Sequence, residues 1–247
     1  MMTEIITENI DIPVQSDGVI LKGSIYCTSM VTPKAPWIIN LAGFMNHRNS
    51  YLVKFFSEKF ATAGFYVLSY DYRGHGETKL GVGIKWYEMV PQIFSDIHVV
   101  IDWIINNQAN RLLEDKIILF GRSLGGAIIL SHGFIDKRAK KLISLSARYD
   151  YRTIQGRYQA VEEREGIEII EKISPKSFLK KDSLNNERIL IAHCKDDETV
   201  PFENLYQIKE HLGLREENVI EFDTGGHTFS GHREDIFNYS LEFLKEL

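Results

Sequence analysis

Cysteine is scarce in this chain: Cys27 and Cys194 are its only two thiols in 247 residues, too few and too far apart for a disulfide framework. Basic charge is not in excess, because 29 Lys and Arg against 34 Asp and Glu leave a net charge of −5, which argues against a nucleic-acid partner. No apolar run approaches the roughly 18 residues of a membrane span. The N-terminus also lacks the basic and apolar regions of a secretory signal. Together these absences predict a cytoplasmic protein without a membrane span.

The remaining composition is that of an ordinary globular protein. Apolar residues make up 44% of the chain and charged residues 26%. A chain of 247 residues is long enough for one domain with a full core. We therefore expect a single domain over residues 1–247, and a homodimer is left open.

Apolar strands alternate with segments of helical spacing along most of the chain. An antiparallel hairpin is expected over residues 9–27, followed by strands at 36–41, 66–70, 116–120, 142–145, 188–192 and 218–222. Helices are expected at 51–63, 90–108, 202–212 and 233–247. This alternation is typical of an α/β fold with a mostly parallel central sheet covered by helices on both faces.

Residues 148–186 interrupt the alternation. The segment is charged, rich in Tyr and only weakly periodic, and it stands where a short connection between two strands is expected. Connections this long inside a compact domain are usually functional. We expect a small, mostly helical lid over the mouth of a site. Its Arg148, Arg152 and Arg157 are interleaved with tyrosines and contact either an anionic or aromatic substrate or only solvent.

The most informative motif is the pentapeptide Gly121-Arg122-Ser123-Leu124-Gly125, which lies between a buried strand and an apolar helical stretch. Small residues on both sides of Ser123 let the strand and the helix approach each other without a clash. The serine can then sit on a sharp, strained turn with its hydroxyl exposed. This G-x-S-x-G pattern between strand and helix predicts a nucleophile elbow.

A serine hydroxyl becomes a good nucleophile only when an oriented base accepts its proton. Asp196 and Asp197 follow the strand at 188–192, and His227 lies in a Gly-rich loop after the strand at 218–222. The carboxyl ends of parallel strands meet at one sheet edge, so all three loops should lie near Ser123. The order Ser, Asp, His is the order found in α/β-hydrolases. No metal or organic cofactor is expected, because His232 beside Glu234 and Asp235 does not supply the ligand set of a zinc site.

The chain resembles a group of small serine hydrolases in these motifs. Two further stretches support the resemblance: Leu41-Ala42-Gly43-Phe44 and Asp71-Tyr72-Arg73-Gly74-His75-Gly76. The group belongs to the α/β-hydrolases and includes monoacylglycerol lipases, serine aminopeptidases and cinnamoyl or feruloyl esterases. The resemblance extends from Trp37 to the last helix.

The resemblance implies that Ser123 is the nucleophile, His227 the general base and acid, and Asp197 the acid that orients His227. The family pattern H-G-x-x-D-x-x-V-P matches His193, Asp197, Val200 and Pro201, and so favours Asp197 over Asp196. Cys194 replaces the glycine of that pattern.

The backbone N–H groups of Phe44 and Leu124 would form the oxyanion hole. Ala42 stands where the family usually has a histidine, and Asn46 or His47 is a candidate to replace its hydrogen bonds.

The expected activity is hydrolysis of small to medium carboxylic esters, with feruloyl or cinnamoyl esters included, through an acyl-enzyme on Ser123. The fold and the nucleophile leave thioesters, monoacylglycerols, peptides and amides open as substrates, and a non-catalytic ligand-binding homologue is an alternative of another class. Candidate substrate contacts are Arg122, Tyr149, Arg152 and Val200. For Arg122 an ion pair with an acid beneath the lid is favoured over a substrate contact, and Arg73 is expected to pair with Asp71.

Overall fold

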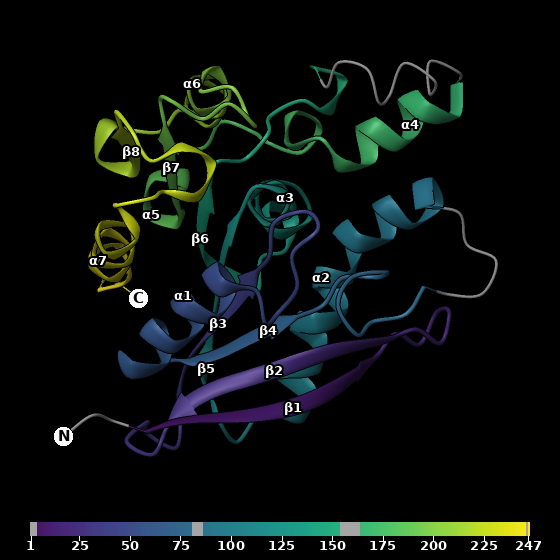
Figure 1. Ribbon diagram of the computed structural model, residues 1–247, viewed down its shortest axis with the longest axis vertical. Helices are drawn as coiled ribbons and strands as arrows, with labels where there is room; N and C mark the ends of the chain where they lie inside the picture. The colour runs from purple at the N-terminus through teal and green to yellow at the C-terminus, as the bar shows by residue number, and fades with distance from the viewer. Residues whose placement is uncertain (1–3, 81–85, 154–163, 246) are drawn as a thin grey trace.

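The computed structural model describes residues 4–80, 86–153, 164–245 and 247, and its centre is one eight-stranded sheet (Figure 1). The strands lie in the order β1-β2-β4-β3-β5-β6-β7-β8, from β1 at the bottom of the view to β8 at the top. Their bounds are Ile5–Pro13 (β1), Ile20–Thr28 (β2), Ala35–Leu41 (β3), Tyr66–Tyr70 (β4), Leu112–Arg122 (β5), Ala139–Leu145 (β6), Ile189–Cys194 (β7) and Val219–Phe222 (β8).

The sheet is mostly parallel. Strand β2 pairs antiparallel with both β1 and β4, whereas β4, β3, β5, β6, β7 and β8 pair in parallel. The carboxyl ends of these six strands therefore share one edge, where ligands of open α/β sheets bind. The predicted α/β fold class is confirmed, and so is the N-terminal hairpin.

Helices cover both faces of the sheet. The longer helices are α1 (Tyr51–Thr62), α2 (Trp86–Asn107), α4 (Arg164–Ile173), α6 (Glu203–Leu212) and α7 (Arg233–Leu244). Shorter turns are α3 (Leu124–Ile128), the π-helical η1 (Ile129–Gly133), α5 (Asn185–Arg188) and the 3₁₀ turns η2 (Tyr151–Thr153), η4 (Pro175–Ser177), η5 (Glu216–Asn218) and η6 (Gly226–Thr228).

Successive residues of the central strands alternate between two cores, because side chains of a strand point to opposite faces. Ile117 and Leu119 of β5 belong to a core that also contains residues of α2, α3 and α6, whereas Ile118 and Phe120 belong to one that contains residues of α1 and α7. All four are buried, so β5 reads as an uninterrupted apolar run, as expected of a strand covered on both faces.

The segment between β6 and β7 contains η2, α4, η4 and α5 in its described part, and residues 154–163, with Arg157, lie outside the described residues. Helix α4 packs against α2, and its Ile170 and Ile173 are buried in the core beneath it. The role of residues 148–186 as a lid stays a prediction.

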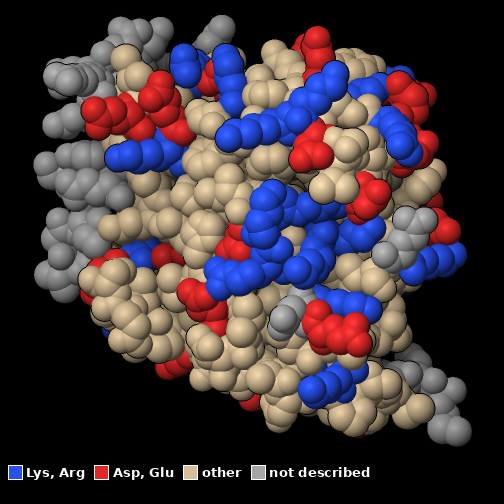
Figure 2. Space-filling model, turned by 180° about the vertical axis from the view of Figure 1, so that it is seen from behind, with Lys and Arg blue, Asp and Glu red and all other residues tan. Residues whose placement is uncertain are grey.

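Charged side chains of both signs are spread over the face shown in Figure 2, with Lys and Arg gathered near its centre. Among the described helices, none is both long and apolar enough to cross a membrane.

Candidate active site

Ser123 sits on a strained turn between β5 and α3. Its φ of 59° and ψ of −115° lie in a region that favours glycine. Close packing enforces the turn: a Cβ at Gly121 would lie 2.8 Å from the Leu41 side chain, and one at Gly125 would lie 2.8 Å from the Ala42 carbonyl oxygen. The Ser123 N–H is held by Leu145 O at 2.8 Å. Both flanking glycines are therefore required by the close approach of β3, in the way that a nucleophile elbow demands.

The loop after β3 forms a tight turn beside the serine. Asn46 N–H donates to Gly43 O at 3.1 Å across the turn, and Met45 has the positive φ of 62° that the third turn position needs. The Asn46 side chain donates to Phe44 O at 3.1 Å, so Asn46 is one of the groups that support the loop in which Ala42 replaces a histidine.

Tyr72 stabilises the start of the same loop by a hydrogen bond. Its hydroxyl is buried and donates to Ala42 O at 2.8 Å. In the sequence, Tyr72 stands out only as part of a motif. A signal for its role is nevertheless present, because the hydroxyl of a tyrosine buried near a strand end usually finds a hydrogen-bond partner. In the described part of the chain, the N–H groups of Phe44 and Leu124 have no hydrogen-bond partner, so both are available as donors.

Asp197 holds His227. The Asp197 Oδ2 atom is 2.7 Å from His227 Nδ1 and 3.0 Å from His193 Nε2. Its Oδ1 atom accepts the N–H groups of Thr199 and Val200, both at 2.9 Å. Although burial opposes ionisation, these donors from the two histidines and the backbone hold the pKa of Asp197 well below its usual range. The carboxylate is thus ionised and can fix the His227 ring with a proton on Nδ1.

The neighbouring acid has a different partner. Asp196 accepts the backbone N–H groups of Gly225 and Gly226, at 3.1 and 2.8 Å. It holds the loop that carries His227, whereas Asp197 holds the imidazole itself. The geometry therefore favours Asp197 as the orienting acid.

Arg122 also binds the histidine loop. Its Nη1 donates to the backbone oxygen of His227 at 3.0 Å. Among the described residues no carboxylate lies within salt-bridge distance of Arg122, and the predicted ion pair with an acid beneath the lid stays a prediction. Burial lowers the pKa of Arg122, while the charge of Asp197 opposes that shift. The side chain does not line the main cavity described next.

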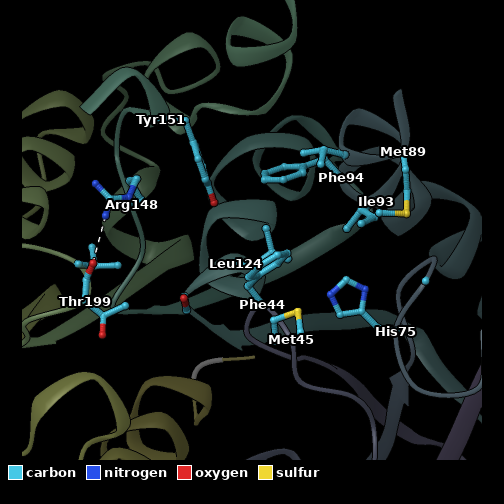
Figure 3. Close-up of a pocket in the computed structure, with 14 residues that line it drawn as sticks. Phe44, Met45, His75, Met89, Ile93, Phe94, Leu124, Arg148, Tyr151 and Thr199 are labelled. Carbon is cyan, nitrogen blue, oxygen red and sulfur yellow. Dashed lines mark hydrogen bonds between the residues drawn. The ribbon is translucent and has the colours of Figure 1, made fainter. Parts of the chain in front are cut away.

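A cavity of about 610 Å³ opens over Ser123 (Figure 3). Most of its lining is apolar, and Arg148 with Thr199 lies at the opposite end from His75 and Met89. The lining residues are Phe44, Met45, Gly74, His75, Met89, Val90, Ile93, Phe94, Ser123, Leu124, Arg148, Tyr151, Thr199 and Val200. The Ser123 hydroxyl has no hydrogen-bond partner within the described residues, and catalytic contacts often close only when a substrate binds.

Two of the predicted substrate contacts lie outside this cavity. The Tyr149 hydroxyl is 2.9 Å from His211 Nδ1, on the side of α6. Arg152 is directed to Asp150 and Glu171, with N–O distances of 3.8 and 3.9 Å. Neither side chain is among the lining residues, because each is engaged elsewhere in the segment after β6.

The ion pairs behind the cavity also differ from expectation. Arg73 does not pair with Asp71; it is buried and binds Asp96 through Nε and Nη2, both at 2.7 Å, and also contacts Asp17. Asp71 binds Arg48 instead. The Arg48–Asp71 pair fixes the loops after β3 and β4 to one another, and the Arg73–Asp96 pair fixes the loop after β4 to α2. Among the described residues, no group of three or more His, Cys, Asp or Glu side chains could hold a metal ion.

The parallel sheet, the strained serine after β5 and the acid and histidine loops after β7 and β8 are the features of an α/β-hydrolase. A profile of the serine aminopeptidase S33 family of hydrolases matches residues 32–204, and the chain therefore belongs to this family.

The chain is also similar to a protein of Escherichia coli. An uncharacterized 31.7 kDa protein from the traX-finO intergenic region of Escherichia coli is 36% identical over 118 residues, which are 47% of this chain and 39% of that protein. The match thus spans well under half of the relative's length.

Two solved structures share the fold over nearly their whole length. Est1E from Butyrivibrio proteoclasticus with bound ferulic acid has a TM-score of 0.71 at 19% identity, covering 96% of this chain and 98% of that one. Esterase 2 from Thermogutta terrifontis, phosphoramylated by tabun, also has a TM-score of 0.71, at 21% identity, covering 97% and 94%.

Proposed function

We propose that the protein is a serine carboxylesterase that hydrolyses small to medium carboxylic esters. Ser123 is the nucleophile, His227 the general base and acid, Asp197 the orienting acid, and the N–H groups of Phe44 and Leu124 form the oxyanion hole. The observation that carries the proposal is the strained Ser123, with φ 59°, which lines the same cavity as Phe44 and Leu124.

The reaction proceeds in two acyl-transfer steps. Ser123 Oγ attacks the ester carbonyl carbon while His227 Nε2 accepts the hydroxyl proton, and the two N–H groups stabilise the negative oxygen of the tetrahedral intermediate. His227 then donates that proton to the departing alcohol as the C–O bond breaks. A water molecule then attacks the acyl-enzyme carbonyl carbon while His227 accepts its proton. As the bond to Ser123 Oγ breaks, His227 returns the proton to that oxygen, which releases the acid and restores the serine hydroxyl. Asp197 stays ionised throughout and stabilises the imidazolium.

The cavity supports an acyl group of moderate size. About 610 Å³ of mostly apolar space fits a short alkyl or a single aromatic group. Rings of Phe44, Phe94 and Tyr151 are part of the lining, which favours aromatic acyl groups such as cinnamoyl among the candidates.

The test is hydrolysis of a chromogenic ester series, acetyl, butyryl, octanoyl and feruloyl, by the wild type and by Ser123→Ala. We expect turnover that disappears in the variant and labelling of Ser123 by a fluorophosphonate. Full activity of Ser123→Ala would refute the assignment of the nucleophile. A folded wild type that neither turns over esters nor reacts with the fluorophosphonate would refute the esterase proposal and favour a ligand-binding role.

A further inference from the structure

Arg148 places a cation at one end of a mostly apolar cavity. It follows β6 by three residues, after a turn at Ser146, whose φ is 45° and whose N–H donates to Ala192 O at 2.9 Å. In Figure 3 the guanidinium lies beside Thr199, across the cavity from His75, with Leu124 and Phe44 between them. Arg148 and Ser123 therefore face the same space.

The guanidinium is bound only by neutral oxygens in the described part of the chain. Nη2 donates to Thr199 O and Nη1 to Thr153 Oγ1, both at 3.1 Å. An Arg side chain has five N–H donors, so three of them are without a described partner. No described carboxylate lies within salt-bridge distance of Arg148, whereas Arg152 in the same segment is directed to Asp150 and Glu171.

Arg188 shows how a structural arginine without a carboxylate partner is built in this fold. Its Nε, Nη1 and Nη2 atoms donate to four backbone oxygens, those of Ala139, Phe134, Gly133 and Asp136. Arg148 has half as many partners and lines a cavity. A guanidinium is planar, and pairs of its N–H donors match the two oxygens of a carboxylate.

We propose that Arg148 binds a carboxylate of the substrate, so that the preferred substrates are esters that carry one free carboxylate. This inference rests on the proposed esterase function and narrows its substrate class. The apolar lining from Val200 to Ile93 contacts the body of such a substrate, and Arg148 fixes its charged end. The carboxylate can belong either to the acyl group or to the alcohol, and the two cases are separated by experiment.

The experiment uses two matched pairs of esters. In the first pair the charge is on the acyl group: 4-nitrophenyl glutarate monoester against its methyl-capped form. In the second pair it is on the leaving group: 4-acetoxybenzoate against its methyl ester. For each pair, the ratio of kcat/KM for the charged ester to that for the neutral ester is measured in the wild type, Arg148→Met, Arg148→Lys and Arg152→Met.

We expect the charged-to-neutral ratio of one pair to fall about tenfold or more in Arg148→Met. A smaller fall is expected in Arg148→Lys, which keeps the charge but loses the fork, and no fall in Arg152→Met, which changes a charge of the same segment outside the cavity. Comparing ratios between variants cancels the different reactivities of the esters. The pair that responds tells which part of the substrate holds the carboxylate.

The wild type offers a second readout that needs no substitution. Its preference for the charged ester should weaken as salt is raised, because a partly exposed charge pair is screened. Turnover of all four esters with ratios that Arg148→Met and salt leave unchanged would overturn this inference alone. Failure of the wild type to hydrolyse any of the four would overturn the esterase proposal as well.

Discussion

Removal of one hydroxyl at Tyr72 should weaken both the fold and the proposed catalysis. In Tyr72→Phe the Ala42 carbonyl loses a buried donor at 2.8 Å. Leaving a buried polar group without its partner costs about 1–3 kcal/mol. For a chain of this size, that loss corresponds to a fall of roughly 2–12 °C in Tm. Ala42 lies two residues before Phe44, so a shift of the loop also moves a proposed oxyanion donor.

The kinetic effect follows from the same geometry. Loss of an oxyanion donor costs about 10²–10³ in kcat. Partial displacement of the Phe44 N–H should therefore lower kcat by about tenfold, with little change in KM, because the donor acts mainly on the transition state. Urea unfolding and steady-state hydrolysis of a chromogenic ester measure the two effects.

Tyr70 supplies the matched control. It is also buried, and its ring lies 5.5 Å from that of Tyr72, but its hydroxyl has no hydrogen-bond partner among the described residues. Tyr70→Phe therefore removes an unsatisfied polar group and should leave stability unchanged or raise it. Equal losses of stability in the two variants, or an unchanged kcat in Tyr72→Phe, would refute the role given to the Tyr72 hydroxyl.

Three further predictions concern the elbow, the acid and the buried thiol. In Gly125→Ala the new Cβ would lie 2.8 Å from Ala42 O. We therefore expect the unfolding free energy to fall by about 1–3 kcal/mol and ester hydrolysis to be lost. A fully active, equally stable variant would contradict the packing argument. The folded-state pKa of Asp197 is well below its unfolded value, so the stability it contributes is fully present above about pH 4 and declines gradually as the pH falls toward the folded-state pKa. The gap in urea stability between wild type and Asp197→Asn should therefore be smaller at pH 3 than at pH 7. Burial raises the pKa of the Cys194 thiol to about 12. Iodoacetamide at pH 8 should therefore alkylate it slowly in the native protein and rapidly in urea, as followed by mass spectrometry. Rapid labelling of the native protein would show that the thiol is accessible.

Local patterns in the sequence were enough to predict the fold class and the loops that meet at the proposed site. The strand at 116–120 and the turn at Ser123 can each be predicted from a few neighbouring residues, because an apolar run indicates a buried strand and flanking glycines indicate a tight turn. The start of α2 was predicted four residues too late. Pro91 is typical of a first helical turn, which is consistent with a helix from Val90, yet α2 begins at Trp86.

The sequence did not predict which groups the charged side chains bind. Arg73 is two residues from Asp71 but binds Asp96, which lies 23 residues away on α2. Arg122 reaches the backbone of His227, 105 residues later. Tyr149 and Arg152 share a segment with Arg148, yet only Arg148 lines the cavity. Such contacts depend on side-chain directions that only the assembled fold defines.

The strained turn at Ser123 sets stability and activity against each other. A non-glycine residue held at φ 59° and ψ −115° costs about 1–3 kcal/mol, and glycine at this position would relieve that strain while removing the hydroxyl. A search for heat-resistant variants that ignores turnover should therefore recover Ser123→Gly. The proposed nucleophile is thus a position at which the most stable sequence and the working sequence differ.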